Sequence, residues 1–157
     1  MGSAQAPDDN STTAEPRIRA AAIGDASDVA LLLDALGYPC SRDEAAERIA
    51  FVLGDPRQHL LLAEIDGHAC GMVASDMRYS VTRGSDQTRI TALVVLPECS
   101  RRGIGRRLLR EVESISRRAG IARIEVTSNA RRAEAHAFYH GCSYADGSRH
   151  FFKLLGD

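Results

Sequence analysis

The sequence lacks any long apolar run, and its first residues lack the features of a secretory signal peptide. A helix that spans a bilayer needs about 20 consecutive apolar residues, and no stretch of this 157-residue chain provides them. Residues 1–16 contain neither a basic start nor an apolar segment. We therefore interpret residues 1–16 as a flexible polar tail and expect a cytoplasmic protein that does not enter membranes.

Closely spaced cysteines are also missing. Cys40, Cys70, Cys99 and Cys142 are far apart, and no two of them form a C-x-x-C pair, the spacing that zinc sites and thioredoxin-like redox sites use. Without a secretory signal, reduced thiols that fill space in the core are expected rather than two disulfides. The sequence thus predicts neither a disulfide framework nor a bound metal.

A strong net charge is absent as well, yet the basic residues are unevenly distributed. The formal net charge is −1, whereas residues 101–132 contain ten arginines and only three glutamates. Nucleic-acid-binding domains are more often basic overall and interleave aromatic with basic residues, and aromatic residues make up only 5% of this chain. The pattern favours a local anionic ligand and argues against nucleic acid as a partner.

The length and the apolar pattern predict one domain over residues 17–157, large enough to bury a core without disulfides. Periodicity and turn signals give the order β-α-α-β-β-β-α-β-α-β-β. The predicted elements include a helix capped by Asp25 and ended by Gly37, a helix capped by Ser41 with Glu44, a hairpin turned at Asp66-Gly67, a loop over 81–87, a strand over 88–96, a helix over 103–119, a strand over 121–128, a helix ended by Gly141 and a last strand pair within 142–155.

The strands over 88–96 and 121–128 are joined by a helix, and such a crossover makes neighbouring strands parallel. Most other strands follow one another through short turns, which favours antiparallel pairing. We therefore predict an α/β fold with a mixed, mostly antiparallel sheet, a central parallel strand pair and helices on both faces.

The stretch LVVLPECSRRGIGRRLL, residues 93–109, breaks a buried strand and resumes as a helix after two glycines. The first amides of a helix have no partners and carry partial positive charge. Because Gly103 and Gly105 have no Cβ, an anion can approach these amides closely. Charge-assisted contacts to a pyrophosphate would come from the neighbouring arginines Arg101, Arg102 and Arg106.

The glycine spacing alone leaves alternatives open. A dinucleotide fingerprint would need glycine or alanine at Leu108, and a P-loop would need Gly-Lys-Ser/Thr, which the stretch lacks. A plain helix start on a basic surface also fits the same residues.

Two motifs taken together resemble a known family. ALVVLPECSRRGIGRRLL resembles the acyl-CoA-binding motif of the GNAT superfamily of acetyl-CoA-dependent N-acetyltransferases, and TSNARRAEAHAFYHGCSY resembles its second motif, with the pattern N…A..FY…G. The motifs stand in the family's order and separation, and the resemblance covers residues 17–155. Three residues before Gly103 the family usually has Gln or Arg, where this chain has Ser100; Arg101 and Arg102 would supply the charge instead.

The resemblance implies which residues bind acetyl-CoA. The strand would pair with the pantetheine arm through the backbone of Leu93, Val94 and Val95. The turn would hold the pyrophosphate through the amides of Arg101, Arg102, Gly103, Ile104, Gly105 and Arg106. Asn129 matches a position that often contacts the CoA arm, and it equally fits an N-cap of the following helix.

The resemblance also implies a mechanism. Tyr139 matches the family tyrosine that is proposed to protonate the departing CoA thiolate, although a tyrosine that only packs beside Phe138 fits as well. The amide of Val95 would stabilise the oxyanion. Thr91 stands where relatives often have a glutamate base and cannot remove a proton; His136 is the nearby alternative, or else a packed histidine.

The predicted function is direct transfer of an acetyl group from acetyl-CoA to a primary amine of a small molecule, a protein or a peptide. The alternative is a catalytically silent CoA-binding sensor of the same fold. The amine would bind near the first two helices and residues 79–87, where Asp43, Glu44 or Asp76 would attract a cation. The resemblance is also compatible with a homodimer.

Overall fold

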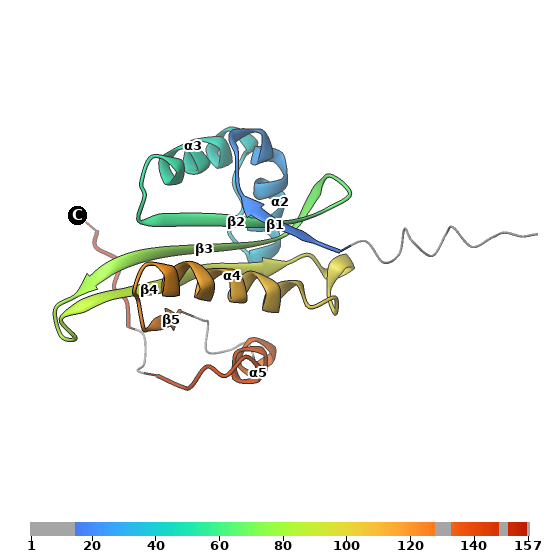
Figure 1. The fold of residues 1–157 in the computed structure, drawn as a ribbon. Helices are drawn as coiled ribbons and strands as arrows, with labels where there is room; N and C mark the ends of the chain where they lie inside the picture. The colour runs from blue at the N-terminus through green and yellow to red at the C-terminus, as the bar shows by residue number, and fades with distance from the viewer. Residues whose placement is uncertain (1–14, 128–132, 148–150, 157) are drawn as a thin grey trace, which may run out of the picture.

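The computed structural model describes residues 15–127, 133–147 and 151–156, so most of the predicted tail lies outside the described part. The elements follow one another as β1 (Arg17–Ala20), a 3-10 turn η1 (Ile23–Asp25), α2 (Ala26–Leu36), α3 (Arg42–Leu53), β2 (Gln58–Ile65), β3 (His68–Ser80), β4 (Ser85–Val95), η2 (Pro97–Cys99), α4 (Ile104–Arg118), β5 (Ile124–Val126) and α5 (Ala133–Gly141) (Figure 1).

The five strands form one sheet in the order β1-β2-β3-β4-β5. The first four pair antiparallel with their neighbours, whereas β4 and β5 are parallel. Helix α4 connects the parallel pair, because parallel neighbours need a crossover connection. The predicted mixed sheet is thus confirmed, and β5 is the edge strand among the strands that the structure describes.

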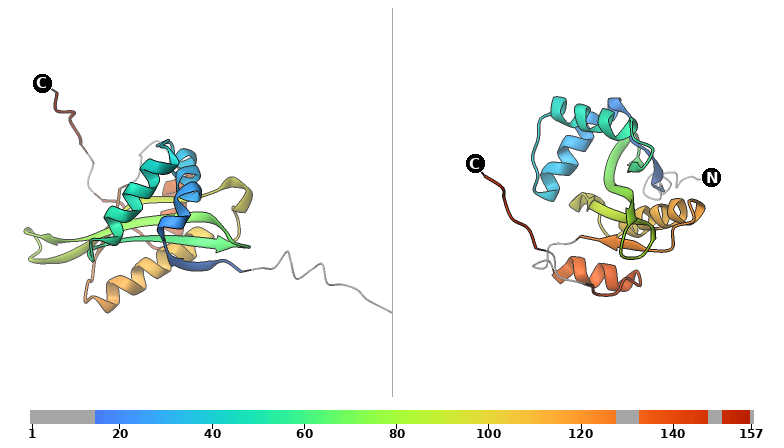
Figure 2. Two further views of the ribbon diagram at one scale, coloured as in Figure 1. Left: turned by 90° about the horizontal axis from the view of Figure 1, so that it is seen from above. Right: turned by 90° about the vertical axis from the view of Figure 1, so that its left-hand side faces the viewer.

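Helices cover both faces of the sheet, as predicted (Figures 1 and 2). On one face, α2 and α3 pack over the sheet, and Leu32, Ile49 and Met72 are buried together there. On the other face lie α4 and α5, with Val73 and Leu108 in a second buried cluster. No helix within the described ranges is both long and apolar enough to cross a membrane.

Most of the predicted caps and turns are confirmed. The Ser41 hydroxyl accepts a hydrogen bond from the Glu44 amide at 3.0 Å, and the Glu44 carboxylate accepts one from the Ser41 amide at 2.8 Å. Gly37 ends α2 at φ 107°. Asp66 and Gly67, at φ 52° and 82°, form the turn between β2 and β3, where positive φ is required of a tight hairpin.

Asp25 occupies the predicted N-cap position of α2, but its side chain makes no capping hydrogen bond to that helix. The carboxylate instead accepts hydrogen bonds from the Ala22 amide at 2.7 Å and from Arg19, which also donates to Glu64 at 2.6 Å. The bound guanidinium holds the pKa of the Asp25 carboxyl below its usual value. Asp25 therefore ties η1 to β1 and β2.

The loop predicted over 81–87 is shorter than expected. Residues 85–87 belong to β4 and pair with residues 78–80 of β3, so only residues 81–84 form the turn. These strand ends are exposed and polar, and they lack the apolar alternation that marks a half-buried strand. The hairpin consequently extends beyond the core, as Figure 1 shows.

The last strand pair predicted within 142–155 is also absent from the described residues. The described residues 142–147 and 151–156 contain no strand, and the strand predicted over 121–128 is only three residues long, β5. The apolar residues of 151–155 are almost fully exposed. Residues 151–155 have an apolar composition typical of a strand, but they pair with no strand of the described structure.

Helix α4 approaches β3 very closely at Gly71. A Cβ atom at this position would lie 2.9 Å from Cγ2 of Ile104 and 3.3 Å from Cδ1 of Leu108. Both of those side chains are buried, so they cannot move aside freely. The missing side chain of Gly71 therefore sets how near the first turn of α4 lies to the sheet.

We predict that Gly71→Ala lowers the free energy of unfolding by about 1–3 kcal/mol, the usual cost of overpacking a core. Urea denaturation of both proteins measures this difference. The matched control is Gly24→Ala, because a Cβ at Gly24 has no neighbour within 4 Å, and its effect should stay within about 0.5 kcal/mol. Equal stability of the wild type and Gly71→Ala would contradict the close approach of α4.

Candidate functional site

A groove begins where β4 leaves its parallel neighbour. β4 and β5 are paired only over Thr88–Ile90 and Ile124–Val126, followed by a bond of 3.4 Å from the Thr127 amide to the Ile90 carbonyl. β4 continues to Val95 with β3 as its partner. The second edge of its last residues therefore has no strand against it among the described residues.

The amides on this free edge can be assigned from the ladder on the other side. The Leu96 amide donates to the Cys70 carbonyl at 2.9 Å, toward β3. Because amide directions alternate along a strand, the amides of Val95 and Leu93 point to the opposite edge, into the groove. The backbone between Ile90 and Leu96 is thus available to an extended ligand.

The glycine turn closes one end of the groove. Arg101 and Gly103 both have positive φ, 66° and 72°, and the first hydrogen bond of α4 runs from the Arg107 amide to the Gly103 carbonyl at 3.0 Å. The amides of residues 104–106 precede that bond and are not used within the helix. Amides in this arrangement, at the positive end of the helix dipole, are suited to an anion.

Gly105 has a second reason to be glycine. A Cβ there would lie 3.1 Å from Cζ of Phe138, so α5 packs directly over the turn. This contact brings the two sequence motifs together, since Gly105 belongs to the first and Phe138 to the second. Phe138 and Tyr139 contact each other edge to face, with ring centroids 5.3 Å apart.

The resulting groove has a volume of about 850 Å³, within the range of ligand sites in proteins. It is lined by Leu93, Val94, Val95, Cys99, Ser100, Arg101, Gly103, Ile104, Gly105, Arg106, Glu134, Ala135, Phe138 and Tyr139. The structure thus brings together most of the residues selected from the sequence. Arg102 does not line the groove, and Asn129 lies outside the described residues.

The lining also contains residues that the sequence argument missed. Glu134, Ala135 and Phe138 share one face of α5 with the predicted Tyr139, at spacings of five, four and one residues. That helical spacing was a usable signal once Tyr139 had been chosen. Ser100 lines the groove too, with its hydroxyl donating to the Pro97 carbonyl at 2.9 Å.

Tyr139 is well placed to keep its proton. Its ring contacts both Phe138 and Tyr144, and burial raises the pKa of its phenol, with a smaller contribution from Cys142. No described residue hydrogen-bonds to the Tyr139 hydroxyl, whereas the Tyr144 hydroxyl donates to Glu113 at 2.9 Å. Tyr139 is therefore protonated at neutral pH.

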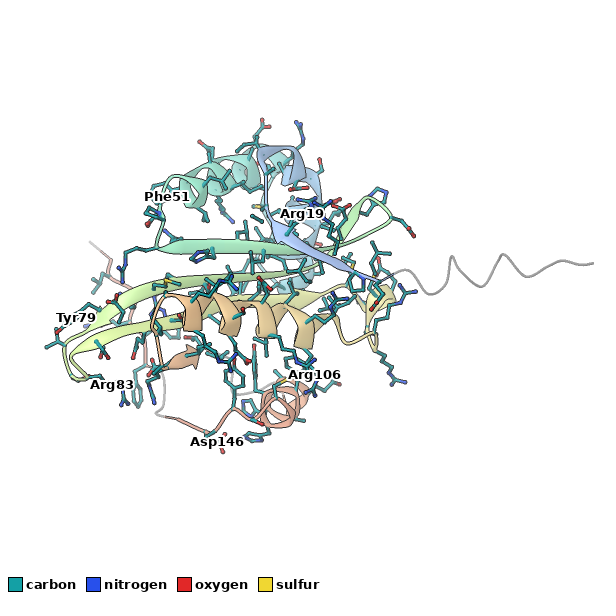
Figure 3. The ribbon with its side chains drawn as sticks, viewed as in Figure 1. Arg19, Phe51, Tyr79, Arg83, Arg106 and Asp146 are labelled. Atoms are coloured by element: carbon teal, nitrogen blue, oxygen red, sulfur yellow. The ribbon has the colours of Figure 1, made fainter. Side chains whose placement is uncertain are left out.

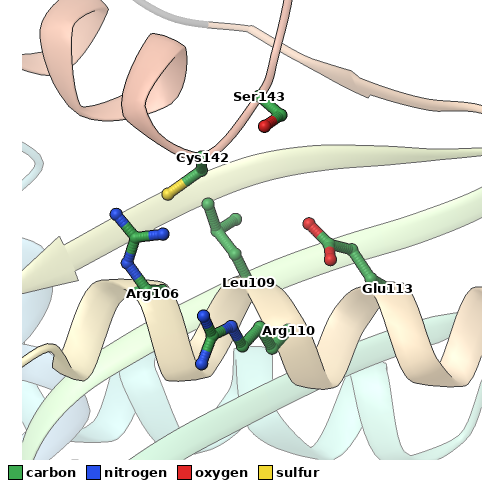
Figure 4. Close-up of a pocket in the computed structure, with 6 residues that line it drawn as sticks. All are labelled: Arg106, Leu109, Arg110, Glu113, Cys142 and Ser143. Atoms are coloured by element: carbon green, nitrogen blue, oxygen red, sulfur yellow. The ribbon is translucent and has the colours of Figure 1, made fainter.

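The Arg106 side chain contacts the end of α5, and Arg106 also lines the groove. It lies between α4 and α5 (Figure 3) and donates to the Gly141 carbonyl at 3.4 Å. On that side a smaller pocket of about 200 Å³ is lined by Arg106, Leu109, Arg110, Glu113, Cys142 and Ser143 (Figure 4). The guanidinium is thus directed toward the end of α5, and the backbone amide is the part of Arg106 suited to an anion in the groove.

The residues considered as bases differ in position. Thr91 stands in a bulge of β4, and its hydroxyl donates to the Ala74 carbonyl at 3.3 Å. His136 is half-buried but does not line the groove. His140, one turn further along α5, pairs with Asp146 at 2.9 Å. Among the groove's described lining residues, Glu134 is the one carboxylate, and it lies on the same face of α5 as Tyr139.

A row of polar side chains crosses the sheet on the α2/α3 face. Gln58, Asp76, Arg89 and Glu125 are paired in register across four strands. Because side chains alternate along a strand, they share the face of Leu60, which packs with α2 and α3. Arg89 donates to Asp76 at 3.4 Å, and the other carboxylate oxygen of Asp76 is buried without a partner among the described residues.

The three acids expected to attract a cationic amine, Asp43, Glu44 and Asp76, differ in position. Glu44 is committed to the cap of α3, and Asp43 is exposed at 95% of its side chain. Asp76 is the one of the three acids that lies on the sheet, one position after Ser75, which with Ala74 faces the bulge at Thr91. Its carboxylate is half-enclosed, with 25% of the side chain exposed.

Comparison with known proteins identifies a family model and relatives that match most of the chain. The model of the acetyltransferase (GNAT) family matches residues 29–144. Aminoalkylphosphonate N-acetyltransferase of Salmonella typhimurium is 33% identical over 125 residues, which cover 80% of this chain and 79% of that protein. Aminoglycoside N(6')-acetyltransferase type 1 of Stenotrophomonas maltophilia is 28% identical and covers 85% of this chain, which in turn spans 89% of it.

Solved structures share the fold at lower identity. The aminoglycoside N-acetyltransferase AAC(6')-Iy in complex with CoA superposes with a TM-score of 0.81 at 16% identity, over 90% of this chain and 95% of that one. The family model covers both motifs that form the groove. The chain therefore belongs to the acetyltransferase (GNAT) family and is an acetyl-CoA-dependent N-acetyltransferase.

Proposed function

We propose that the protein transfers the acetyl group of acetyl-CoA directly to the primary amine of a small cationic molecule. One observation carries this proposal: a single groove is lined by the free edge of β4, the unpaired amides at the start of α4 and the protonated Tyr139. These are the groups that a thioester arm, a pyrophosphate and a leaving thiolate each require. The names of two relatives, which specify an aminoalkylphosphonate and an aminoglycoside, support a small molecule as the acceptor.

Acetyl-CoA would be held mainly by backbone atoms. The pantetheine arm would lie along β4 and bond to the amides of Leu93 and Val95. The pyrophosphate would accept hydrogen bonds from the amides of residues 103–106, and Arg101 would add charge at the mouth of the groove. These roles need no side chain at Ser100, which explains why a departure from the family pattern at that position is compatible with binding.

The reaction then needs a stabilised oxyanion, a protonated leaving sulfur and removal of the amine proton. The amine nitrogen attacks the thioester carbon, and an outward amide of β4 stabilises the negative charge that develops on the carbonyl oxygen. The C–S bond breaks, and Tyr139 gives its proton to the departing sulfur. Because Thr91 cannot accept a proton, we infer that the proton lost by the amine leaves through water, which also restores the Tyr139 phenol.

The acceptor would bind on the α2/α3 face beside the bulge of β4. There the carboxylate of Asp76 is half-enclosed, belongs to the polar row that crosses the sheet and has one oxygen without a partner among the described residues. A second positive charge on the acceptor would be attracted to this carboxylate. A neutral amine without another cationic group would gain nothing from it.

For Tyr139→Phe we predict a turnover number at least about tenfold lower, because a positioned general acid contributes roughly 10²–10⁴-fold. The affinity for acetyl-CoA should remain nearly unchanged. Steady-state assays of thiol release and calorimetric titration separate the two effects. Tyr144→Phe is the matched control, since it removes a neighbouring half-buried hydroxyl that is bonded to Glu113; equal losses in both variants would point to a packing role for Tyr139.

Gly105→Glu should raise the dissociation constant for acetyl-CoA at least about tenfold, since it places bulk against Phe138 and a negative charge beside the pyrophosphate. Calorimetry with acetyl-CoA, and with a CoA fragment that lacks the phosphates, measures the effect. The control Gly147→Glu adds the same charge at a glycine whose Cβ would meet no atom within 4 Å. An affinity equal to that of the control would remove the turn from the binding site.

Asp76→Asn should raise KM for a dicationic amine about tenfold, the typical value of a hydrogen bond to a charged group, and leave KM for acetyl-CoA unchanged. Asp86→Asn is the control, because Asp86 points to the opposite face of the sheet and pairs with Arg57 at 3.2 Å. An unchanged KM for every amine tested would exclude Asp76 from the acceptor site.

A further inference from the structure

Two cysteines that are far apart in the sequence meet beside the segment that leads into the glycine turn. Cys70 of β3 is buried, whereas Cys99 of η2 is half-buried and lines the groove. Both pack in the apolar cluster between the sheet and α4. Cys40 packs against the cluster on the α2/α3 face instead. Cys70 and Cys99 are free thiols in this structure.

A bulge in β3 turns Cys70 toward α4. Ala63 of β2 pairs with Gly71, and Glu64 pairs with Ala69, so Cys70 is the extra residue between them. A bulge changes the direction in which a side chain points, and Cys70 consequently faces α4 together with the adjacent Gly71. Its thiol donates to the Ala63 carbonyl at 3.4 Å.

Backbone hydrogen bonds bring Cys99 to the same place. The Leu96 amide donates to the Cys70 carbonyl, and the Cys99 amide donates to the Leu96 carbonyl, both at 2.9 Å. Leu96 thus links the two cysteines through consecutive hydrogen bonds. Burial raises the pKa of Cys70 to about 12, and the neighbouring Cys99 thiol contributes through its charge and a hydrogen bond between the side chains. The two sulfurs are therefore neighbours.

The two thiols differ in their access to solvent. Cys99 can be reached through the groove, whereas Cys70 is only 4% exposed. Oxidation of a cysteine depends on its exposure and its thiolate, and redox-sensitive cysteines often have a second cysteine beside them that resolves the oxidised form. Cys99 has the position of the cysteine that reacts first, and Cys70 has that of the resolving cysteine.

We propose that hydrogen peroxide converts Cys99 and Cys70 into a disulfide, and that this bond weakens the binding of acetyl-CoA. The Cys99 thiolate attacks the peroxide, the O–O bond breaks, and Cys99 becomes a sulfenic acid while hydroxide leaves and is protonated to water. The Cys70 sulfur then attacks the Cys99 sulfur, the S–O bond breaks, and the oxygen leaves with the Cys70 proton as a second water. The two sulfurs together lose two electrons, which the peroxide takes up.

The disulfide would act on the glycine turn through η2. Bonded sulfurs lie about 2.05 Å apart, closer than two thiols in contact, so η2 moves toward β3. Ile104 is buried against Gly71 and holds the first turn of α4 in place. The displacement therefore falls on residues 100–103, which include the groove residues Ser100 and Arg101. This effect rests on the proposed binding of acetyl-CoA in the groove.

The first experiment maps the disulfide and needs no ligand. The native protein is treated with hydrogen peroxide, free thiols are blocked, and trypsin cleaves after arginine, which places Cys70 and Cys99 in separate peptides, residues 58–78 and 90–101. We expect these peptides to be joined, and to separate on addition of dithiothreitol. In Cys70→Ser, dimedone should instead label Cys99 as a sulfenic acid.

The matched control is Cys142→Ser. Cys142 is also half-buried and lines the neighbouring pocket beside Arg106, so its removal tests whether any accessible thiol serves equally well. The variant should form the same link between peptides 58–78 and 90–101 as the wild type.

The second experiment measures acetyl-CoA binding by calorimetry for the reduced, oxidised and re-reduced protein. We expect oxidation to raise the dissociation constant at least about fivefold, the lower end of typical coupling between sites, and dithiothreitol to restore it. Cys70→Ser cannot form the bond, and its affinity after the same treatment should equal that of the reduced variant.

Three results would overturn the proposal. Unlinked peptides after peroxide treatment would exclude the disulfide, whether or not Cys99 has been oxidised. A link from Cys99 to Cys142 would assign the pairing to the α5 side of the groove. Equal affinity of the oxidised and reduced protein would exclude an effect on the turn. If the reduced protein fails to bind acetyl-CoA, the proposed function fails, while the peptide map still decides on the disulfide.

Discussion

The separation of β4 from β5 beyond Ile90 is the constraint on which the site depends. Parallel neighbours share a ladder only while their backbones stay adjacent, and here they part after three residue pairs. Beyond Ile90, one edge of β4 pairs with β3, and the other edge is free for a ligand. The antiparallel ladder with β3 fixes which amides of β4 face outward, so the register of that ladder determines where the free amides lie.

Close packing also fixes the position of the first turn of α4 relative to the sheet. Gly71 lets α4 approach β3, and Gly105 lets Phe138 of α5 approach α4. Each contact depends on the absence of a side chain. The first amides of α4, the free edge of β4 and Tyr139 are thereby held by three elements that touch one another directly, and a change in any one contact would move the two ends of a bound cofactor relative to each other.

Sequence reasoning recovered the layers, the crossover and most of the groove because those features have local signals. Glycines with special conformations, capping pairs and a predominantly apolar central strand can each be recognised within a few residues. The direction of Arg106, the role of Asp25 and the lining by Glu134 depend on contacts with residues distant in the sequence. The predicted strand within 142–155 had a valid local pattern but no partner within the described chain, because pairing is a property of two segments.

Backbone donors at the groove have a consequence for how such a protein can diverge. An amide of the main chain is supplied by every residue except proline, so mutation can replace the side chains of this region while the donors persist. A site built from main-chain amides is conserved with the fold and does not depend on particular side chains. The fold itself is shared with a solved structure at 16% identity, a level at which most side chains differ while the course of the main chain is kept.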